Sequence, residues 1–460
     1  MSSTVEARAV PTLGRRHDAA EKWIAAAVFA AMFVAYNANG REIGSYDSRP
    51  TALAARELLV RGTLRLDVPV AATPEYATRW GFIRDRSGHY RSIYSPVPAL
   101  VAAALAWPAW KLGVIDVEAP LGPPLVAKLT ASACVAIAVA LAYVTVRRTS
   151  SRPVALLIAA GLGLGTGYWS SASQTLWQAE TALLGLSLAV LLSSGESGTH
   201  GAGSGAAFGG GLALALAARP QLAPAIAIML IGMAWRSRRA ASMAAAVVAA
   251  AGVALVVTNE RWFGNALGAL PLLTDANAAI HATRQTFRAQ ADGYVGLLLS
   301  PSRGILIFSP VVLIAFAGIG TAVRRGLRHS EFWCLLAAAI QFALYGSYSV
   351  WWGGHTFGPR YMIDVLPLLV PVAALALNAG HLQRWRGVAA LTLAWSISVA
   401  ATGAFCYPND AWNTSPTDVD RDHARLWSIS DNQILRCWKN GASPQNFRLV
   451  NRAAFRQAER

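Results

Sequence analysis

The chain of 460 residues is 54% hydrophobic and only 14% charged, which excludes an ordinary soluble globular protein because too few polar residues are present to cover an apolar core of that size. Its formal net charge of +16 would suggest nucleic acid in a soluble chain. Here the arginines fall in short clusters between apolar runs, which is typical of cytoplasmic loops, so nucleic acid is not an expected partner. The composition predicts an all-α polytopic membrane protein.

Apolar segments of spanning length recur along the chain and predict about eleven transmembrane helices. They are residues 23–37, 125–146, 154–169, 177–192, 207–218, 222–235, 241–258, 305–322, 332–349, 365–377 and 388–405. The segment 94–110 is shorter and contains three prolines, Pro96, Pro98 and Pro108, so it is open to two readings, a span or an interfacial helix. The interfacial reading is adopted because it leaves Arg147 and Arg148 on the inner side.

The arginine clusters also orient the chain, since short basic loops stay in the cytoplasm. Residues 1–22 are then a cytoplasmic N-terminus, 23–405 a transmembrane domain with outer loops 38–124 and 259–304, and 406–460 a periplasmic C-terminal tail. The protein is expected in a bacterial plasma membrane. Cys406 and Cys437 both belong to the tail and could form a disulfide outside the cytoplasm.

The first outer loop begins with the stretch GREIGSYDSRP at 40–50, followed by a predicted helix at 51–60 that Gly62 ends. Further motifs follow: SPVP at 95–98 opens the apolar segment 94–110, and the predicted outer ends of later spans carry RP at 219–220, SPSRG at 300–304 and WGGHTFGPRY at 352–361. In this order the motifs resemble those of bacterial GT-C glycosyltransferases related to the protein O-mannosyltransferases. The resemblance covers most of residues 20–405, although each motif alone is short.

This resemblance implies a GT-C bundle with periplasmic juxtamembrane helices, which moves a single sugar from a polyprenyl phosphate donor to a periplasmic acceptor. It also implies that Asp47, the acidic residue of the first outer loop, is the catalytic carboxylate. One departure concerns residues 176–180, where related sequences often carry a histidine and this chain has none. The role of that segment, which contains Glu180, is therefore open.

The chemistry of such a transfer fits the same residues independently. A carboxylate such as Asp47 can take the proton of an acceptor hydroxyl in an inverting reaction. Arginines such as Arg303 and Arg360 can stabilise the charge that grows on the departing phosphate. The phosphate leaves as an anion, so no general acid is needed. Other candidates for substrate binding are Tyr361, His355, Trp352, Lys128, Arg219 and Glu180.

Each candidate has a structural alternative. Asp47 could simply cap a helix, and Arg303, Arg360 and Lys128 could anchor in lipid headgroups at the membrane surface. His355 is interpreted as a structural or substrate-shaping residue, because no second histidine or carboxylate stands near it at ligand spacing. No metal site is predicted; a divalent metal beside Asp47 is conceivable, but the sequence offers no second ligand there.

Two other functions are compatible with the pattern. A flippase or transporter of lipid-linked sugars should carry ionisable groups near the middle of its spans or show repeated halves, and here the charged residues gather at one predicted face. A glycan ligase would use the same phosphate-binding arginines with a different base. The donor sugar and the acceptor, whether protein, lipid or polysaccharide, are not encoded in a recognisable motif.

Overall fold

The computed structural model describes residues 15–194, 201–273, 278, 280, 285–378 and 386–450. The first 14 residues of the predicted cytoplasmic N-terminus, residues 195–200 and the last ten residues of the tail lie outside the described residues. Most of the described chain is helical, and its only named strands within these ranges form one short hairpin.

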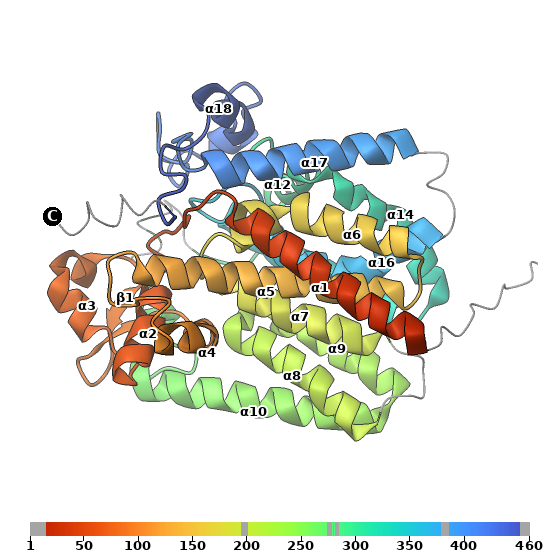
Figure 1. The fold of residues 1–460 in the computed structure, drawn as a ribbon, viewed down its shortest axis with the longest axis horizontal. Coiled ribbons are helices and arrows are strands. Elements are labelled where there is room, and N and C mark those ends of the chain that lie inside the picture. Colours follow the sequence, from red (N-terminus) through yellow and green to blue (C-terminus); the bar gives the residue numbers. More distant parts are fainter. Residues whose placement is uncertain are drawn as a thin grey trace, which may run out of the picture.

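Long helices form the body of the molecule (Figure 1). They are α1 (Arg15–Asn37), α5 (Gly122–Arg147), α6 (Arg152–Leu164), α7 (Ala179–Ser193), α8 (Ala202–Ala218), α9 (Ala223–Arg236), α10 (Arg238–Phe263), α14 (Leu313–Arg325), α15 (Ser330–Ser347), α16 (Leu366–Asn378) and α17 (Arg386–Cys406). Each predicted span overlaps one of them. Within the described ranges, five helical segments are long and apolar enough to cross a membrane: Ala19–Asn37, Gly122–Arg147, Arg238–Phe263, Arg360–Asn378 and Gly387–Cys406.

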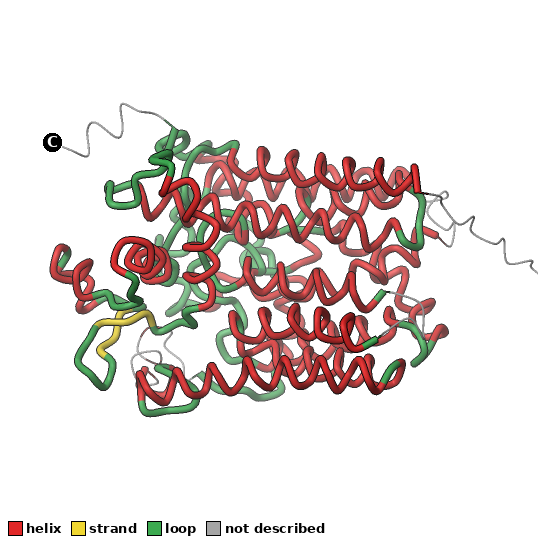
Figure 2. Tube along the Cα trace, turned by 60° about the horizontal axis from the view of Figure 1, so that its bottom comes forward, coloured by secondary structure: helices red, strands yellow, loops and turns green. Residues whose placement is uncertain are grey.

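Shorter elements connect these helices. They are α2 (Arg49–Arg61), α3 (Asp67–Ala72), α4 (Val97–Lys111), α12 (Ala291–Leu299), α13 (Ile305–Phe308) and α18 (Gln433–Asn440), the strands β1 (Phe82–Arg84) and β2 (Tyr90–Ser92), the 3-10 turns η1 (Pro74–Thr78), η3 (Pro220–Leu222), η4 (Leu270–Leu273), η5 (Pro310–Val312), η6 (Arg360–Val365) and η8 (His423–Trp427), and a π-helical turn, η2 (Tyr168–Ala172). The strands pair antiparallel, with Ile83 opposite Arg91. Figure 2 shows the hairpin and the long loops at one end of the helices.

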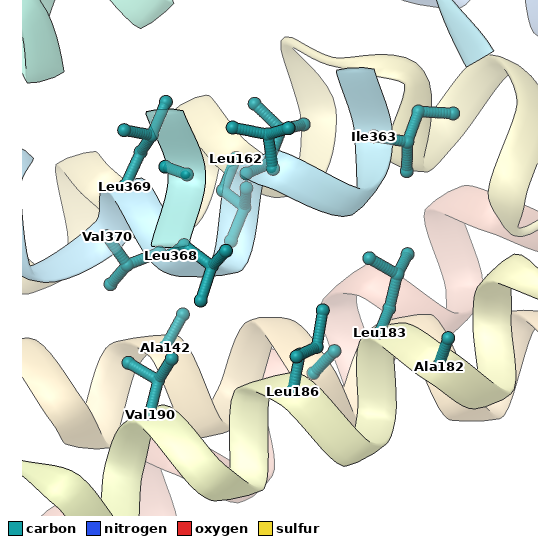
Figure 3. Close-up of a cluster of buried hydrophobic side chains, with 14 of the residues drawn as sticks. Ala142, Leu162, Ala182, Leu183, Leu186, Val190, Ile363, Leu368, Leu369 and Val370 are labelled. Atoms are coloured by element: carbon teal, nitrogen blue, oxygen red, sulfur yellow. The ribbon is translucent and has the colours of Figure 1, made fainter. Parts of the chain in front are cut away.

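The apolar core lies where α5, α6, α7 and α16 meet (Figure 3). Leu183, Leu186 and Val190 lie on one face of α7, at the spacing that places side chains on a single helical stripe. They face Leu368 of α16 and its neighbours. Small residues bring the next helices closer still: a Cβ on Gly185 of α7 would lie 2.5 Å from the carbonyl oxygen of Gly211 in α8. Close backbone packing of this kind is common between membrane helices.

A second, smaller apolar cluster gathers α2, α4 and the hairpin at one end of the bundle (Figure 1). The helix predicted at 51–60 is α2, and Gly62 ends it in the left-handed conformation, as expected. The segment predicted to be interfacial forms α4, which packs beside α2 in this cluster. Both elements belong to the first predicted outer loop, so this end of the bundle carries the candidate site.

At the opposite end of α1, an acidic residue joins the predicted inner arginines. Glu21 Oε1 lies 3.0 Å from Arg147 Nη2 and 2.8 Å from Arg152 Nη2. These contacts fix the start of the first helix against the basic turn between α5 and α6.

The tail after α17 is folded onto the rest of the molecule. Cys406 and Cys437 form a disulfide, and Trp412 between them is fully buried. The backbone nitrogens of Phe447 and Leu449 donate hydrogen bonds to the carbonyl oxygens of Asn39 and Gly40, each at 2.8 Å. The tail therefore braces the start of the loop that leads to Asp47.

Candidate active site

Asp47 lies just before α2, at the end of the bundle that carries the outer loops. Ser48 is the N-cap of α2, and neither it nor Asp47 makes a side-chain capping bond to the helix. The carboxylate of Asp47 instead faces Arg360, whose Nη1 lies 3.4 Å from Asp47 Oδ2. Both side chains are about a quarter exposed, at 27% and 26%. Simple capping does not explain this placement, and the pair joins the first outer loop to the segment 352–361.

Two aromatic rings flank Arg360, and a glycine leaves room for its side chain. Its guanidinium carbon lies 5.7 Å from the ring centre of Trp177 and 5.5 Å from that of Tyr361. Gly353 has φ +76°, and a Cβ there would lie 3.1 Å from Cγ and Nε of Arg360. Among the described residues, the buried Nε of Arg360 has no hydrogen-bond partner. The guanidinium of Arg360 therefore has one donor that no described protein group satisfies.

Tyr94 completes the surroundings of Asp47. Its hydroxyl interacts with the Asp47 carboxylate and also accepts a hydrogen bond from Trp80 Nε1 at 3.0 Å. Burial, followed by the negative charge of Asp47, raises the pKa of Tyr94 well above its usual value. The hydroxyl thus remains protonated and can donate to the carboxylate. Sequence reasoning missed Tyr94 and Trp80, although Tyr94 stands directly before the SPVP motif.

Arg219 and Tyr361 belong to a buried network next to Arg360. Arg219 Nη1 lies 3.1 Å from Asp364 Oδ1, and the hydroxyl of Tyr345 donates to the other oxygen of the same carboxylate. The Tyr345 and Tyr361 rings stack with their centres 5.0 Å apart. The structure therefore places Arg219 behind Tyr361, with its charge already balanced by Asp364.

Lys128 and Glu180 are also buried. Lys128 Nζ donates to Gln174 Oε1 at 2.6 Å, and the charge of Glu42 acts on it. Burial raises the pKa of Glu42, while a hydrogen bond from Thr175 and the charges of Arg49 and Lys128 oppose that rise. Glu180 starts α7 and accepts a bond from Thr181 at 3.3 Å. Lys128 is thus occupied by protein partners and does not reach the membrane surface.

Arg303 occupies a different environment from the one expected of a phosphate ligand. Its side chain is fully buried, and all of its N–H groups meet protein acceptors. These are the carbonyl oxygens of Trp352 (2.9 Å), Ser302 (2.8 Å) and Gly354 (3.0 Å), and the side-chain oxygens of Gln433 (2.7 Å) and Asn413 (2.8 Å). Arg303 therefore ties the segment 352–361 to the tail, and its donors are satisfied by protein acceptors.

Trp352 and His355 likewise contact the tail. Trp352 is buried and its Nε1 donates to Asp420 Oδ1 at 2.6 Å, so its ring does not form an open stacking surface. His355 Nε2 lies 2.9 Å from Asp418 Oδ1 and 3.5 Å from Asp420 Oδ2. The tryptophan beside the Asp47–Arg360 pair is instead the half-buried Trp177, whose ring faces the guanidinium of Arg360.

Most of the chain resembles two crystal structures of ArnT from Cupriavidus metallidurans. The structure bound to undecaprenyl phosphate shares 14% identity and a TM-score of 0.49, covering 92% of this chain and 76% of ArnT. The apo structure shares 14% identity and a TM-score of 0.50, covering 86% of this chain and 66% of ArnT, just under two thirds. No protein family and no curated protein matches the chain in sequence. ArnT is a polytopic GT-C glycosyltransferase, and the predicted GT-C type of fold is confirmed.

Proposed function

We propose that this chain is a membrane glycosyltransferase that moves one sugar from a polyprenyl phosphate donor to a periplasmic acceptor, with Asp47 as the base. The observation that carries the proposal is the Asp47–Arg360 pair, in which a carboxylate and a guanidinium with a spare donor face each other at 3.4 Å. The ArnT-like fold supports the donor class, because one of the ArnT structures holds undecaprenyl phosphate.

The proposed reaction is a single inverting displacement. The acceptor hydroxyl attacks the anomeric carbon of the sugar and passes its proton to Asp47. The bond between that carbon and the phosphate oxygen breaks, and the polyprenyl phosphate leaves with the electron pair. Arg360 stabilises the charge on the leaving phosphate. Donor binding would replace the Asp47–Arg360 contact by a contact between phosphate and guanidinium, which frees the carboxylate to act as a base.

Neighbouring residues would orient these two groups. Tyr94 would donate to the Asp47 carboxylate and orient it, while Trp177 and Tyr361 flank Arg360. Arg219 would act through Tyr361, by holding Asp364 and Tyr345 behind it. His355 and Trp352 contact the tail, and Lys128 and Glu180 bond to neighbouring side chains, so their proposed contribution is to shape the surrounding loops.

The experiment compares cells that carry the native chain, Asp47→Asn or Arg360→Gln at equal membrane levels. We expect Asp47→Asn to reduce transfer by at least about 100-fold, because a positioned base contributes that much. Mass spectrometry of envelope glycans and lipids should then show loss of one defined sugar and accumulation of its polyprenyl phosphate donor. Asp67→Asn is the matched control, since Asp67 is a partly exposed carboxylate of the same outer loop, paired with His89.

Binding of undecaprenyl phosphate to purified protein separates the two roles. Asp47→Asn should retain binding, whereas Arg360→Gln should weaken it. Normal transfer by Asp47→Asn would contradict the assignment of the base, whereas a sugar inventory that does not depend on the presence of the chain would favour a carrier flippase. Loss of a whole glycan rather than one sugar would instead favour a ligase.

A further inference from the structure

Three metal-ligating side chains meet where the segment 352–361 touches the tail. His355 Nε2, Asp418 Oδ1 and an oxygen of Asp420 lie within 4.8 Å of one another. His355 is separated from both aspartates by more than 60 positions in the sequence, so the folded tail creates the group. Among the described residues, it is the only group of three or more histidine, cysteine or acidic side chains that could hold one ion.

Neighbouring residues orient the three side chains. Trp352 Nε1 binds Oδ1 of Asp420, which turns Oδ2 toward His355. The side chain of Asp420 is only 7% exposed. The backbone nitrogen of Asp420 donates to Asp418 Oδ1 at 2.9 Å, and Arg303 fixes the carbonyl of Trp352. Hydrogen bonds of this kind, from a second layer of residues, orient the ligands of protein metal sites.

We propose that His355, Asp418 and Asp420 bind a divalent cation, Zn²⁺ or Mn²⁺, that fastens the segment 352–361 to the tail. One imidazole and two carboxylates suit these ions, because nitrogen favours Zn²⁺ and carboxylates are accepted by both. Two negative charges balance the charge of the cation. His355 and Asp418 are 39% and 36% exposed, so an ion can reach the group from solvent and complete its coordination with water.

The main alternative is a metal-free arrangement in which a protonated His355 bridges the two carboxylates. A second pair in the same molecule shows what an ordinary histidine–aspartate contact looks like. His89 Nδ1 lies 2.9 Å from Asp67 Oδ2, with similar exposure, and the other oxygen of Asp67 accepts from the backbone of Tyr90. Among the described residues, His89 and Asp67 belong to no group of three side chains that could hold one ion. His89 is therefore the matched control.

The proposal is independent of the proposed transferase activity, and its test measures metal content. The full chain, purified with a tag that contains no histidines, is dialysed against metal-free buffer and then given Zn²⁺ or Mn²⁺ alone. After removal of free ion, we expect about one equivalent to remain. His355→Ala, Asp418→Asn and Asp420→Asn should lose it, and His89→Ala should retain it.

Thermal unfolding of the same samples supplies a second readout. The added ion should raise Tm of the wild type and of His89→Ala, because it binds only the folded arrangement. It should not raise Tm of Asp418→Asn, whose exposed side chain makes that variant the least prone to misfolding. Equal metal content in the wild type and all three variants, or a folded wild type that retains no ion, would overturn the proposal in favour of the protonated bridge.

Discussion

Asp410 illustrates at the residue scale how burial alone sets a protonation state. It lies in the tail between Cys406 and Trp412, and its side chain is almost fully buried. Burial raises the pKa of Asp410 to about 6, although the positive charges of Arg303 and Arg436 oppose the rise. At pH 7 the Asp410 side chain is therefore mostly ionised, although burial disfavours its charged form.

The pH dependence of stability follows from this shift. The folded protein binds the proton more tightly than the unfolded chain, so the stabilisation from protonated Asp410 is present near pH 4 and is lost as the pH rises through about 6. The loss is on the order of 3 kcal/mol, at about 1.4 kcal/mol per pKa unit. Asp410→Asn should raise Tm of the purified protein at pH 7.5 and leave it nearly unchanged at pH 4.5.

The control is Asp292→Asn, because Asp292 is exposed in the first turn of α12. It should leave the pH profile of Tm unaltered. A destabilised Asp410→Asn variant at pH 7.5 would show that the carboxylate is instead held by favourable contacts.

Single residues also show which parts of the candidate site could be predicted from the sequence. Asp47 could be selected because it follows the first predicted span, and Arg360 because it ends a glycine-rich motif at an outer end. Arg303 stands in an equally suggestive motif, yet its five acceptors come from residues as distant as Gln433. His355 gains Asp418 and Asp420 in the same way. Local spacing carries no information about contacts that only the folded tail creates.

At the scale of elements, Arg303 links α12, the segment 352–361 and α18. Replacing it by lysine keeps the charge but removes the planar set of donors, so several buried acceptors lose their partners. Each unsatisfied buried group costs about 1–3 kcal/mol. Arg303→Lys should therefore lower Tm by several degrees and make the tail sensitive to trypsin. Burial lowers the pKa of Arg303 to about 10, so the native side chain is charged at neutral pH.

Arg288→Lys is the matched control, since Arg288 is an exposed arginine near the same outer loop. It should change neither Tm nor cleavage. If Arg303→Lys kept its stability but bound undecaprenyl phosphate more weakly, the structural role would be contradicted and Arg303 would be a phosphate ligand.

Among the elements, the helices could be predicted from the sequence, because long apolar runs mark them directly. The fold of the tail could not be predicted, because the tail lacks such a pattern.

For the whole molecule, the central question is which end faces the cytoplasm. The outer loops, the hairpin and the tail lie at one end, and the Glu21 cluster with Arg147 and Arg152 lies at the other (Figure 1). Basic residues near short loops favour the cytoplasmic side, and a disulfide such as Cys406–Cys437 persists in an oxidising compartment. Both arguments favour the prediction that the Asp47 end lies outside the cytoplasm.

Labelling of introduced cysteines tests this orientation. Ser87 in the turn of the hairpin and Arg239 at the start of α10 are both exposed and lie at opposite ends of the bundle. In spheroplasts, a membrane-impermeant maleimide should modify Ser87→Cys and should reach Arg239→Cys only after detergent is added. The native Cys134 and Cys334 are buried and should remain unlabelled in both cases. Labelling of Arg239→Cys alone in intact spheroplasts would invert the topology, and a periplasmic acceptor would then be excluded because the Asp47 carboxylate would face the cytoplasm.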